Sequence, residues 1–376
     1  MMSRLRMTGA VCVCLAFSAL AVPHRVLAQT ELWGGDLVSL VDSLAQERLV
    51  EGPVSGFTIG VKRGADLLLV KGYGAADMEQ GVPANAETVY RIGSLTKQFT
   101  AASVMLLVEE GRIDLDASVT AYLPDYELQG HEVTVRHLLT HTSGIKSYTN
   151  LGDAFWLEAG FHDLSHAEMR ALFEDEPFDF APGEEYRYNN SAYYLLGMII
   201  EEASGVSYED YLVEHIFLPL GLTRSSYCHE SRITPGRAQG YERFEGALIN
   251  DGPISMNTPG AAGALCSTVP DLLSWTAALR AGRVVTTESY RAMTTSARLN
   301  DGSLTEYGFG LGVSALGEQV RIVHTGGING FSTVMSHYPE SDLDIVILSN
   351  TGSPVPGQME RAIAGWALGV AGGGER

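Results

Sequence analysis

Three short segments of this chain carry the side chains that could perform covalent chemistry. They are Ser94-Leu95-Thr96-Lys97, Tyr188-Asn189-Asn190 and His324-Thr325-Gly326-Gly327. Ser94 and Lys97 are three residues apart, and residues at that spacing share one face of a helix, so the lysine amine can lie beside the serine hydroxyl. A serine becomes a good nucleophile when a nearby base, here a lysine or a tyrosine of lowered pKa, accepts its proton.

The second and third segments supply further groups of the same kind. Tyr188 offers a hydroxyl and Asn190 an amide. Gly326 and Gly327 lie at the predicted end of a strand, where backbone N–H groups can face a developing oxyanion. Together the three segments predict an acyl-transfer site.

The elements that must position these segments follow from apolar periodicity. A hairpin is predicted over 56–62 and 66–73, and an apolar helix over 94–110 has Ser94 in its first turn. The positive end of that helix dipole would help to stabilise a serine oxyanion. Further helices are predicted over 190–203, 268–279 and 362–368. Helix-capping patterns begin at Ser165, Ser207 and Thr268. Strands are predicted over 309–315, 320–324, 331–338 and 343–348.

This order of elements predicts the fold class. Strands occur toward both ends of the chain, and residues from about 115 to 255 look largely helical. We therefore expect an α/β (α+β) fold with a mostly antiparallel sheet, flanked by terminal helices, and an inserted all-helical subdomain over about 115–255.

The first 28 residues are typical of a secretory signal peptide. Arg4 and Arg6 precede an apolar run over 10–22, and small residues follow at 26–28. An uncleaved N-terminal anchor is the alternative, although the run is short for a membrane span. We expect a periplasmic or secreted protein whose hydrolase domain spans 29–376 and has no integral membrane span after cleavage.

Charge and cysteine content narrow the function classes further. The formal net charge of the whole chain is −20, which argues against nucleic acid and anionic membranes as partners. Two of the four cysteines, Cys228 and Cys266, remain after the predicted cleavage. In an oxidising compartment they can form a disulfide, but the sequence leaves two unpaired thiols equally open.

With its flanking motifs, the sequence resembles the serine β-lactamase and penicillin-binding-protein superfamily, in the branch of class C β-lactamases, D-Ala-D-Ala carboxypeptidases and esterases. The likeness runs from about Leu40 to the C-terminus. Besides the three segments, it rests on Tyr90-Arg91-Ile92-Gly93, His137-Leu138-Leu139-Thr140-His141-Thr142-Ser143-Gly144, Pro182-Gly183, Leu195-Leu196-Gly197 and Gly263-Ala264-Leu265-Cys266-Ser267-Thr268.

The resemblance implies a role for each site residue. Ser94 would be the acylated nucleophile, Lys97 its proton acceptor or the group that tunes Tyr188, and Tyr188 a proton shuttle. Backbone N–H groups of Ser94 and Gly327 would form the oxyanion hole. The substrate-binding residues would be Asn190, which would also position Lys97, together with His324, Thr325 and Gly326. Neither a cofactor nor a metal is implied, and the partner would be a small-molecule or peptide substrate.

One departure from the family pattern concerns His324. The β-lactamases of this branch usually have lysine at this position, and a histidine near its reference pKa of about 6.5 is largely neutral at pH 7. If His324 meets a substrate carboxylate, binding should strengthen as pH falls. This difference favours a carboxypeptidase, peptidase or esterase over a dedicated β-lactamase, which remains the alternative.

Two other interpretations are less favoured. His137 and His141 have a spacing that can bind a metal on a helix face, and His131 lies nearby, but no acidic or cysteine partner follows at a matching interval. A catalytically inactive peptide- or peptidoglycan-binding relative would not need Ser94, Lys97 and Tyr188. We therefore expect a metal-independent serine hydrolase that forms an acyl-enzyme on small amides or esters, such as D-amino-acid peptides.

Overall fold

The structure, a computed structural model, describes residues 24–52, 54–152, 155 and 160–370. Most of the predicted signal peptide, residues 1–23, lies outside these residues. The first described element is helix α1 (His24–Glu51). No helix in the described part of the chain combines the length and the apolar character that a membrane span requires.

A seven-stranded antiparallel sheet forms the centre of the fold. Its strand order is β3-β2-β1-β12-β11-β10-β9, so the N-terminal hairpin pairs with the last strand through residues such as Phe57 and Ser349. The predicted hairpin and the four C-terminal strands are confirmed. The strands are β1 (Gly56–Arg63), β2 (Asp66–Asp77), β3 (Val82–Pro83), β9 (Gly312–Leu316), β10 (Gln319–Ile328), β11 (Phe331–Tyr338) and β12 (Leu343–Ser349).

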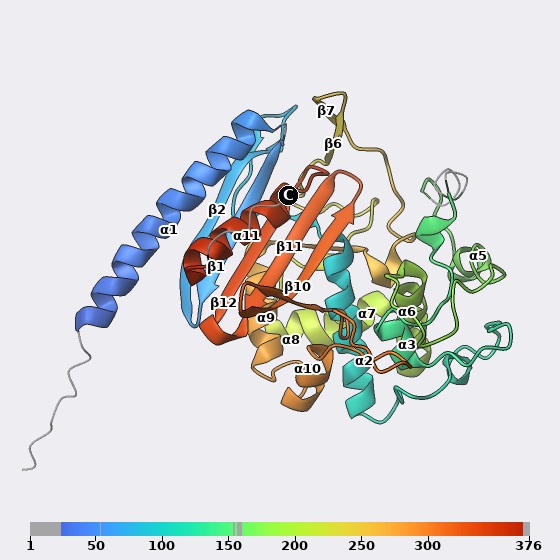
Figure 1. Cartoon of the computed structure of the whole chain (residues 1–376). Helices are drawn as coiled ribbons and strands as arrows, with labels where there is room; N and C mark the ends of the chain where they lie inside the picture. Colours follow the sequence, from blue (N-terminus) through green and yellow to red (C-terminus); the bar gives the residue numbers. More distant parts are fainter. Residues whose placement is uncertain (1–23, 53, 153–154, 156–159, 371–376) are drawn as a thin grey trace, which may run out of the picture.

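Each face of this sheet is covered by helices, as Figure 1 shows. On one face, α1 and α11 (Val355–Leu368) pack on apolar side chains of β1, β11 and β12 to form a separate core, which includes Leu37, Ile59 and Ile363. On the other face lies the larger core, to which the remaining helices contribute. The expected terminal helices that flank an antiparallel sheet are thus confirmed, and α11 begins before the predicted residue 362.

The helices on the second face match the predictions from periodicity and capping. Ser165, Ser207 and Thr268 each accept a hydrogen bond from the backbone N–H three residues later, as N-caps do. The helices are α2 (Thr96–Glu109), α3 (Val135–Leu139), α5 (His166–Ala171), α6 (Asn190–Ser204), α7 (Tyr208–Leu212), α8 (Leu218–Leu220), α9 (Val269–Arg280) and α10 (Thr287–Met293), with one-turn 3-10 helices that include η1 (Gly93–Leu95) and η5 (Gly260–Ala262).

The expectation that residues 115–255 form an all-helical insertion is wrong at its C-terminal end. This part contains β5 (Ser226–Tyr227) and a hairpin of β6 (Tyr241–Phe244) and β7 (Ala247–Asn250). Glu245 and Gly246 both have positive φ, at 48° and 82°, which is the backbone of a tight two-residue hairpin turn. Residues 241–250 therefore form a hairpin rather than a helix, because the tight turn lets the two strands pair.

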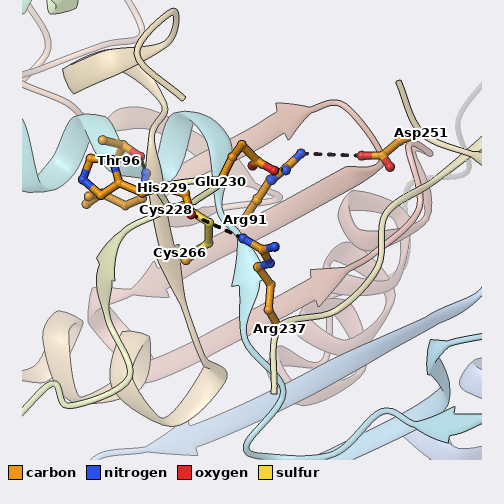
Figure 2. The surroundings of a disulfide bond; sticks show 9 residues. Arg91, Thr96, Cys228, His229, Glu230, Arg237, Asp251 and Cys266 are labelled. Atoms are coloured by element: carbon orange, nitrogen blue, oxygen red, sulfur yellow. Dashed lines mark hydrogen bonds and ion pairs between the residues drawn. A yellow bond between two sulfur atoms is a disulfide. The ribbon is translucent and has the colours of Figure 1, made fainter. Parts of the chain in front are cut away.

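A second, three-stranded sheet has the order β4-β8-β5, with β4 (Tyr90–Arg91) and β8 (Leu265–Ser267). Beside it, Cys228 and Cys266 form a disulfide (Figure 2), which resolves the question that the sequence left open. Both cysteines are buried, and Cys228 also donates a backbone hydrogen bond to Ala264. The disulfide and the backbone hydrogen bond thus join the segment that follows β5 to β8, the strand that precedes α9.

Candidate active site

Ser94 and Lys97 lie next to one another at the start of the buried helix. Ser94 is in η1, two residues before α2 begins, and Lys97 is in the first turn of α2. Lys97 Nζ donates a hydrogen bond to Ser94 Oγ across 3.2 Å. The predicted proximity of the two side chains is therefore confirmed, although Ser94 lies in a 3-10 turn rather than within the α-helix.

The Lys97 amine has three hydrogen-bond neighbours. Besides Ser94 Oγ, Nζ lies 2.8 Å from Asn190 Oδ1 and 2.7 Å from Ala262 O, and both of these oxygens can only accept. An ammonium group would donate to all three atoms. A neutral amine would donate to Asn190 and Ala262 and turn its lone pair toward the Ser94 hydroxyl. Both protonation states of Lys97 are thus satisfied without rearrangement.

Burial favours the neutral state of this amine. Lys97 is fully buried, and loss of hydration lowers its pKa well below the usual value for lysine. The described residues form no ion pair with Lys97, so no carboxylate opposes this effect. A lysine in this environment can therefore act as a base toward the Ser94 hydroxyl.

The aromatic ring of Tyr188 lies against the Lys97 amine. Its ring centroid lies 4.8 Å from Lys97 Nζ, and its buried hydroxyl has no hydrogen-bond partner within the described part of the chain. Burial raises the pKa of Tyr188 well above its usual value, and the nearby Ser94 hydroxyl partly offsets this rise. Tyr188 is therefore held as a neutral phenol that can donate a proton.

The residues after Tyr188 begin helix α6, and this start is anchored at two points. Asn189 is the N-cap, because its Oδ1 accepts from the Ala192 N–H at 2.9 Å while its amide nitrogen bonds Ile145 O. The Asn190 side chain, one residue later, points Oδ1 at Lys97 and places Nδ2 3.4 Å from Thr149 Oγ1. The N-cap thus determines the orientation in which Asn190 meets the lysine.

Glycines bring strand β10 against the serine turn. Gly93 has φ of 52°, and a Cβ on it would approach Gly327 N to 3.0 Å. A Cβ on Gly326 would lie 2.1 Å from Ile92 O, whereas one on Gly327 would meet nothing within 4 Å. The backbones of Ser94 and Gly327 therefore border the same open space, which is the arrangement that a pair of oxyanion-binding N–H groups requires.

A cavity of about 480 Å³ adjoins these groups. The residues that line it include Ser94, Asn190 and Gly327, together with Glu242 and Phe331. It has space for a small acyl group that is joined to Ser94.

Comparison with known proteins identifies the family. The profile of the family described as Beta-lactamase matches residues 41–369, which is most of the chain. The chain belongs to this family. It is a serine acyl-transfer hydrolase of the β-lactamase and penicillin-binding-protein superfamily, as the three sequence segments predicted.

Individual relatives agree with this assignment. Penicillin-binding protein 4* of Bacillus subtilis is 31% identical over 331 residues, which cover 84% of this chain and 71% of that protein. The octameric penicillin-binding protein homologue from Pyrococcus abyssi is 32% identical with a TM-score of 0.78, over 88% of this chain and 77% of that one. A D-stereospecific amidohydrolase from Streptomyces sp. is 27% identical with a TM-score of 0.74, over 88% and 99% of the two chains.

Within this β-lactamase-family fold, the surroundings of His324 contradict the hypothesis that it binds a substrate carboxylate when it is protonated. Its side chain is buried, Nδ1 lies 2.6 Å from Thr325 O, and Nε2 lies 2.8 Å from the Tyr307 hydroxyl. A carbonyl can only accept, so Nδ1 carries the proton and Nε2 accepts from Tyr307. Burial lowers the pKa of His324 to about 3, and a proton on Lys97 would act in the same direction. The proposed pH-dependent cation that binds a substrate carboxylate is therefore wrong, because the imidazole stays neutral inside the protein.

The neighbouring strand residues follow the alternation of a β-strand. Thr325 and Gly327 are exposed on one face of β10, whereas His324 and Gly326 are buried on the opposite face. Strand β9 pairs with β10 only as far as Val323, so in the described sheet the remainder of β10 pairs with β11 alone. The end of β10 that reaches the cavity, at Gly327 and Ile328, therefore has no strand paired with its second edge in the described sheet.

His141 supports the active site, a role that was not predicted from its sequence context. This residue is buried with φ of 59°, and its Nδ1 accepts a hydrogen bond from Asn189 N at 3.0 Å. Its ring centroid lies 4.4 Å from that of Tyr188. His141 thus supports the segment that carries Tyr188 and Asn190. Its position within the family motif over 137–144 was a signal, but its partner lies 48 residues away.

The other two histidines considered as metal ligands have structural contacts. His137 Nδ1 accepts a hydrogen bond from Thr134 N at 3.2 Å and completes the cap of α3, and the His131 ring stacks on Phe178.

Proposed function

We propose that this chain is a secreted hydrolase that forms an acyl-enzyme at Ser94 on small amides or esters, D-amino-acid peptides among them. The observation that carries the proposal is the contact of a fully buried Lys97 amine with Ser94 Oγ at 3.2 Å. The 27% identical amidohydrolase, described as D-stereospecific, supports the choice of substrate class.

In the proposed acylation step, neutral Lys97 accepts the Ser94 proton as Oγ attacks the substrate carbonyl. The lowered pKa of Lys97 and the raised pKa of Tyr188 favour the lysine as this base. The new oxyanion is bound by the backbone N–H groups of Ser94 and Gly327. Tyr188 then donates its proton to the leaving amine or alcohol and is reprotonated through Lys97, with which it titrates as a coupled pair.

Deacylation reverses these roles. Tyr188 relays a proton from water to neutral Lys97 as the water attacks the ester carbonyl, and Lys97 then returns this proton to Ser94 Oγ as the serine leaves. Asn190 holds the lysine through its Oδ1 and offers Nδ2 to the substrate amide. An extended substrate would pair as an added strand with the part of β10 that β9 leaves unpaired, which includes Thr325 and Gly326.

The described lining of the cavity contains no cation to hold a substrate carboxylate, and His324 stays neutral. We therefore place β-lactam hydrolysis second to the turnover of amides and esters.

The test is covalent labelling with a fluorophosphonate and a fluorescent penicillin, followed by mass measurement of the modified peptide. We expect the label on Ser94 and its loss in Ser94→Ala, since removal of a serine nucleophile lowers the rate by about 10⁶ in a well-studied hydrolase. Ser332→Ala is the matched control, because Ser332 lines the same cavity but its hydroxyl donates to the carbonyls of Thr351 and Ser353. Undiminished labelling of Ser94→Ala would refute the assignment.

Export is the second part of the proposal. The composition of residues 1–28 and the disulfide between Cys228 and Cys266 both suit an oxidising compartment outside the cytoplasm. Mass measurement of the protein recovered from producing cells should give a mature N-terminus at Gln29, and an intact Met1 would contradict cleavage.

A further inference from the structure

Glu242 is the single charged side chain among the described residues that line the cavity beside Ser94. It lies on β6, which is held against the end of the main sheet. Tyr241 N donates to Asn350 O at 3.1 Å, and Gly352 N donates to Tyr241 O at 3.0 Å. The backbone of β6 therefore fixes the place of Glu242 in the wall of the cavity.

The carboxylate itself is also oriented. Its Oε1 accepts a hydrogen bond from Gly330 N at 2.8 Å. A Cβ on Gly352 would lie 2.4 Å from Oε2, so the carboxylate packs closely against the Gly352 backbone. Glu242 is half-buried, and it forms no ion pair with any residue in the described ranges. One carboxylate oxygen is thus available to a ligand.

Other carboxylates near Glu242 add to the negative electrostatic potential of this part of the cavity. Arg91 is the neighbouring cation, but it is shared by Glu230 and Asp251, as Figure 2 shows. Burial raises the pKa of Asp251, Arg91 opposes this rise, and the charge of Glu242 adds to it. Because Arg91 pairs with Glu230 and Asp251 but not with Glu242, the region around Glu242 keeps a negative potential that attracts a cation.

Two features limit the shape of the ligand. One is the distance from the oxyanion-binding Gly327 to the residue that binds the Glu242 carboxylate, and the other is the apolar lining of the cavity. Gly330, which binds the carboxylate, follows Gly327 by three residues, so the two lie at most about 11 Å apart. The cavity is also lined by apolar side chains such as Ile328 and Phe331. A short apolar chain with a positive charge at its far end matches this arrangement.

We propose that Glu242 binds an ammonium group that the substrate carries at the end of its acyl part remote from the reacting carbonyl. The enzyme therefore selects cationic acyl donors over neutral or carboxylate-bearing ones of equal length. This inference rests on the proposed acyl-enzyme at Ser94 and adds a specificity-determining residue to it.

The experiment compares p-nitrophenyl esters of 6-aminohexanoate, heptanoate and adipate. These acyl chains have equal length and end in an ammonium, a methyl and a carboxylate group, and an extended aminohexanoyl chain places its nitrogen about 7 Å from the carbonyl carbon. The wild-type protein should prefer the ammonium ester. Glu242→Gln should lower kcat/KM for that ester about tenfold, through KM, and change the heptanoate ester less than twofold.

Glu245→Gln is the control, because it removes the same charge from the exposed turn of the same hairpin. It should leave all three esters nearly unchanged. Equal losses on the ammonium and methyl esters in Glu242→Gln, or no preference in the wild-type protein, would overturn the inference while Ser94-dependent hydrolysis still stands. Absence of Ser94-dependent hydrolysis of every ester would instead refute the proposed function, and this inference with it.

Discussion

Tyr307 donates a hydrogen bond from its hydroxyl to Nε2 of His324 across 2.8 Å, and this contact holds the imidazole in its neutral form. The tyrosine hydroxyl and the carbonyl of Thr325 together occupy both ring nitrogens. A position where the related β-lactamases usually have a lysine is therefore filled by an uncharged, internally bonded group.

This relationship predicts a pH dependence of stability. The folded-state pKa of His324, about 3, lies below the usual value of about 6.5, so the unfolded chain binds the proton more readily. Stability should therefore fall as pH drops from 6.5 toward 3, with up to about 1.4 kcal/mol per pH unit due to this residue. His324→Gln should lose about 1–2 kcal/mol less than the wild-type protein between pH 6.5 and 5. Urea unfolding of both proteins at the two pH values measures this difference, and parallel curves would disprove it.

Tyr188→Phe should reduce turnover far more than it weakens binding. The change deletes one proton-carrying oxygen and leaves the ring against Lys97 and His141 in place. General acid–base groups are worth about 10²–10⁴ in rate, so kcat should fall by that factor with little change in the substrate dissociation constant. Single-turnover kinetics with an activated ester separate the two quantities. Near-normal turnover would mean that Lys97 works without the tyrosine.

Gly326→Ala and Gly327→Ala should behave differently although they are adjacent. A Cβ at position 326 would lie 2.1 Å from Ile92 O and 2.4 Å from Thr333 Oγ1, so β10 must move away from the serine turn. That displacement should cost about 10²–10³ in kcat, as the loss of an oxyanion donor does. Gly327→Ala meets nothing within 4 Å and should fold normally, with its effect confined to KM for bulky acyl groups. Circular dichroism and ester kinetics of the two variants test the contrast, which identical profiles would contradict.

Removal of the disulfide should lower stability and spare the active site. Cys228 and Cys266 are separated by 38 residues, and a cross-link of that length stabilises a protein by about 3–4 kcal/mol in the chain-entropy model. Cys228→Ser combined with Cys266→Ser should therefore shift the urea midpoint strongly while kcat at 25 °C stays within about twofold. The wild-type protein under reducing conditions is the second measurement, and an unchanged midpoint in both would show that the bond contributes little.

The local chemistry could be predicted from the sequence because it depends on short spacing. Ser94 and Lys97 are three residues apart at a helix start, so their contact needs only the helical repeat. The caps at Ser165, Ser207 and Thr268 likewise involve a side chain and a backbone N–H three residues away. The hairpin of β1 and β2 follows from alternation around a short turn. The family motifs then related these local features to the fold class.

Tertiary structure decided what depends on burial and on contacts between distant residues. Lys97 meets Asn190 and Ala262, 93 and 165 residues away, and its lowered pKa follows from an enclosure that no local pattern describes. His324 looked like a titratable substrate ligand in sequence, but the Tyr307 hydroxyl and the surrounding core keep it neutral. Glu242 became part of the cavity only because β6 docks beside β12. Side-chain types and short spacing are properties of the sequence, whereas solvation and long-range neighbours arise only when the chain folds.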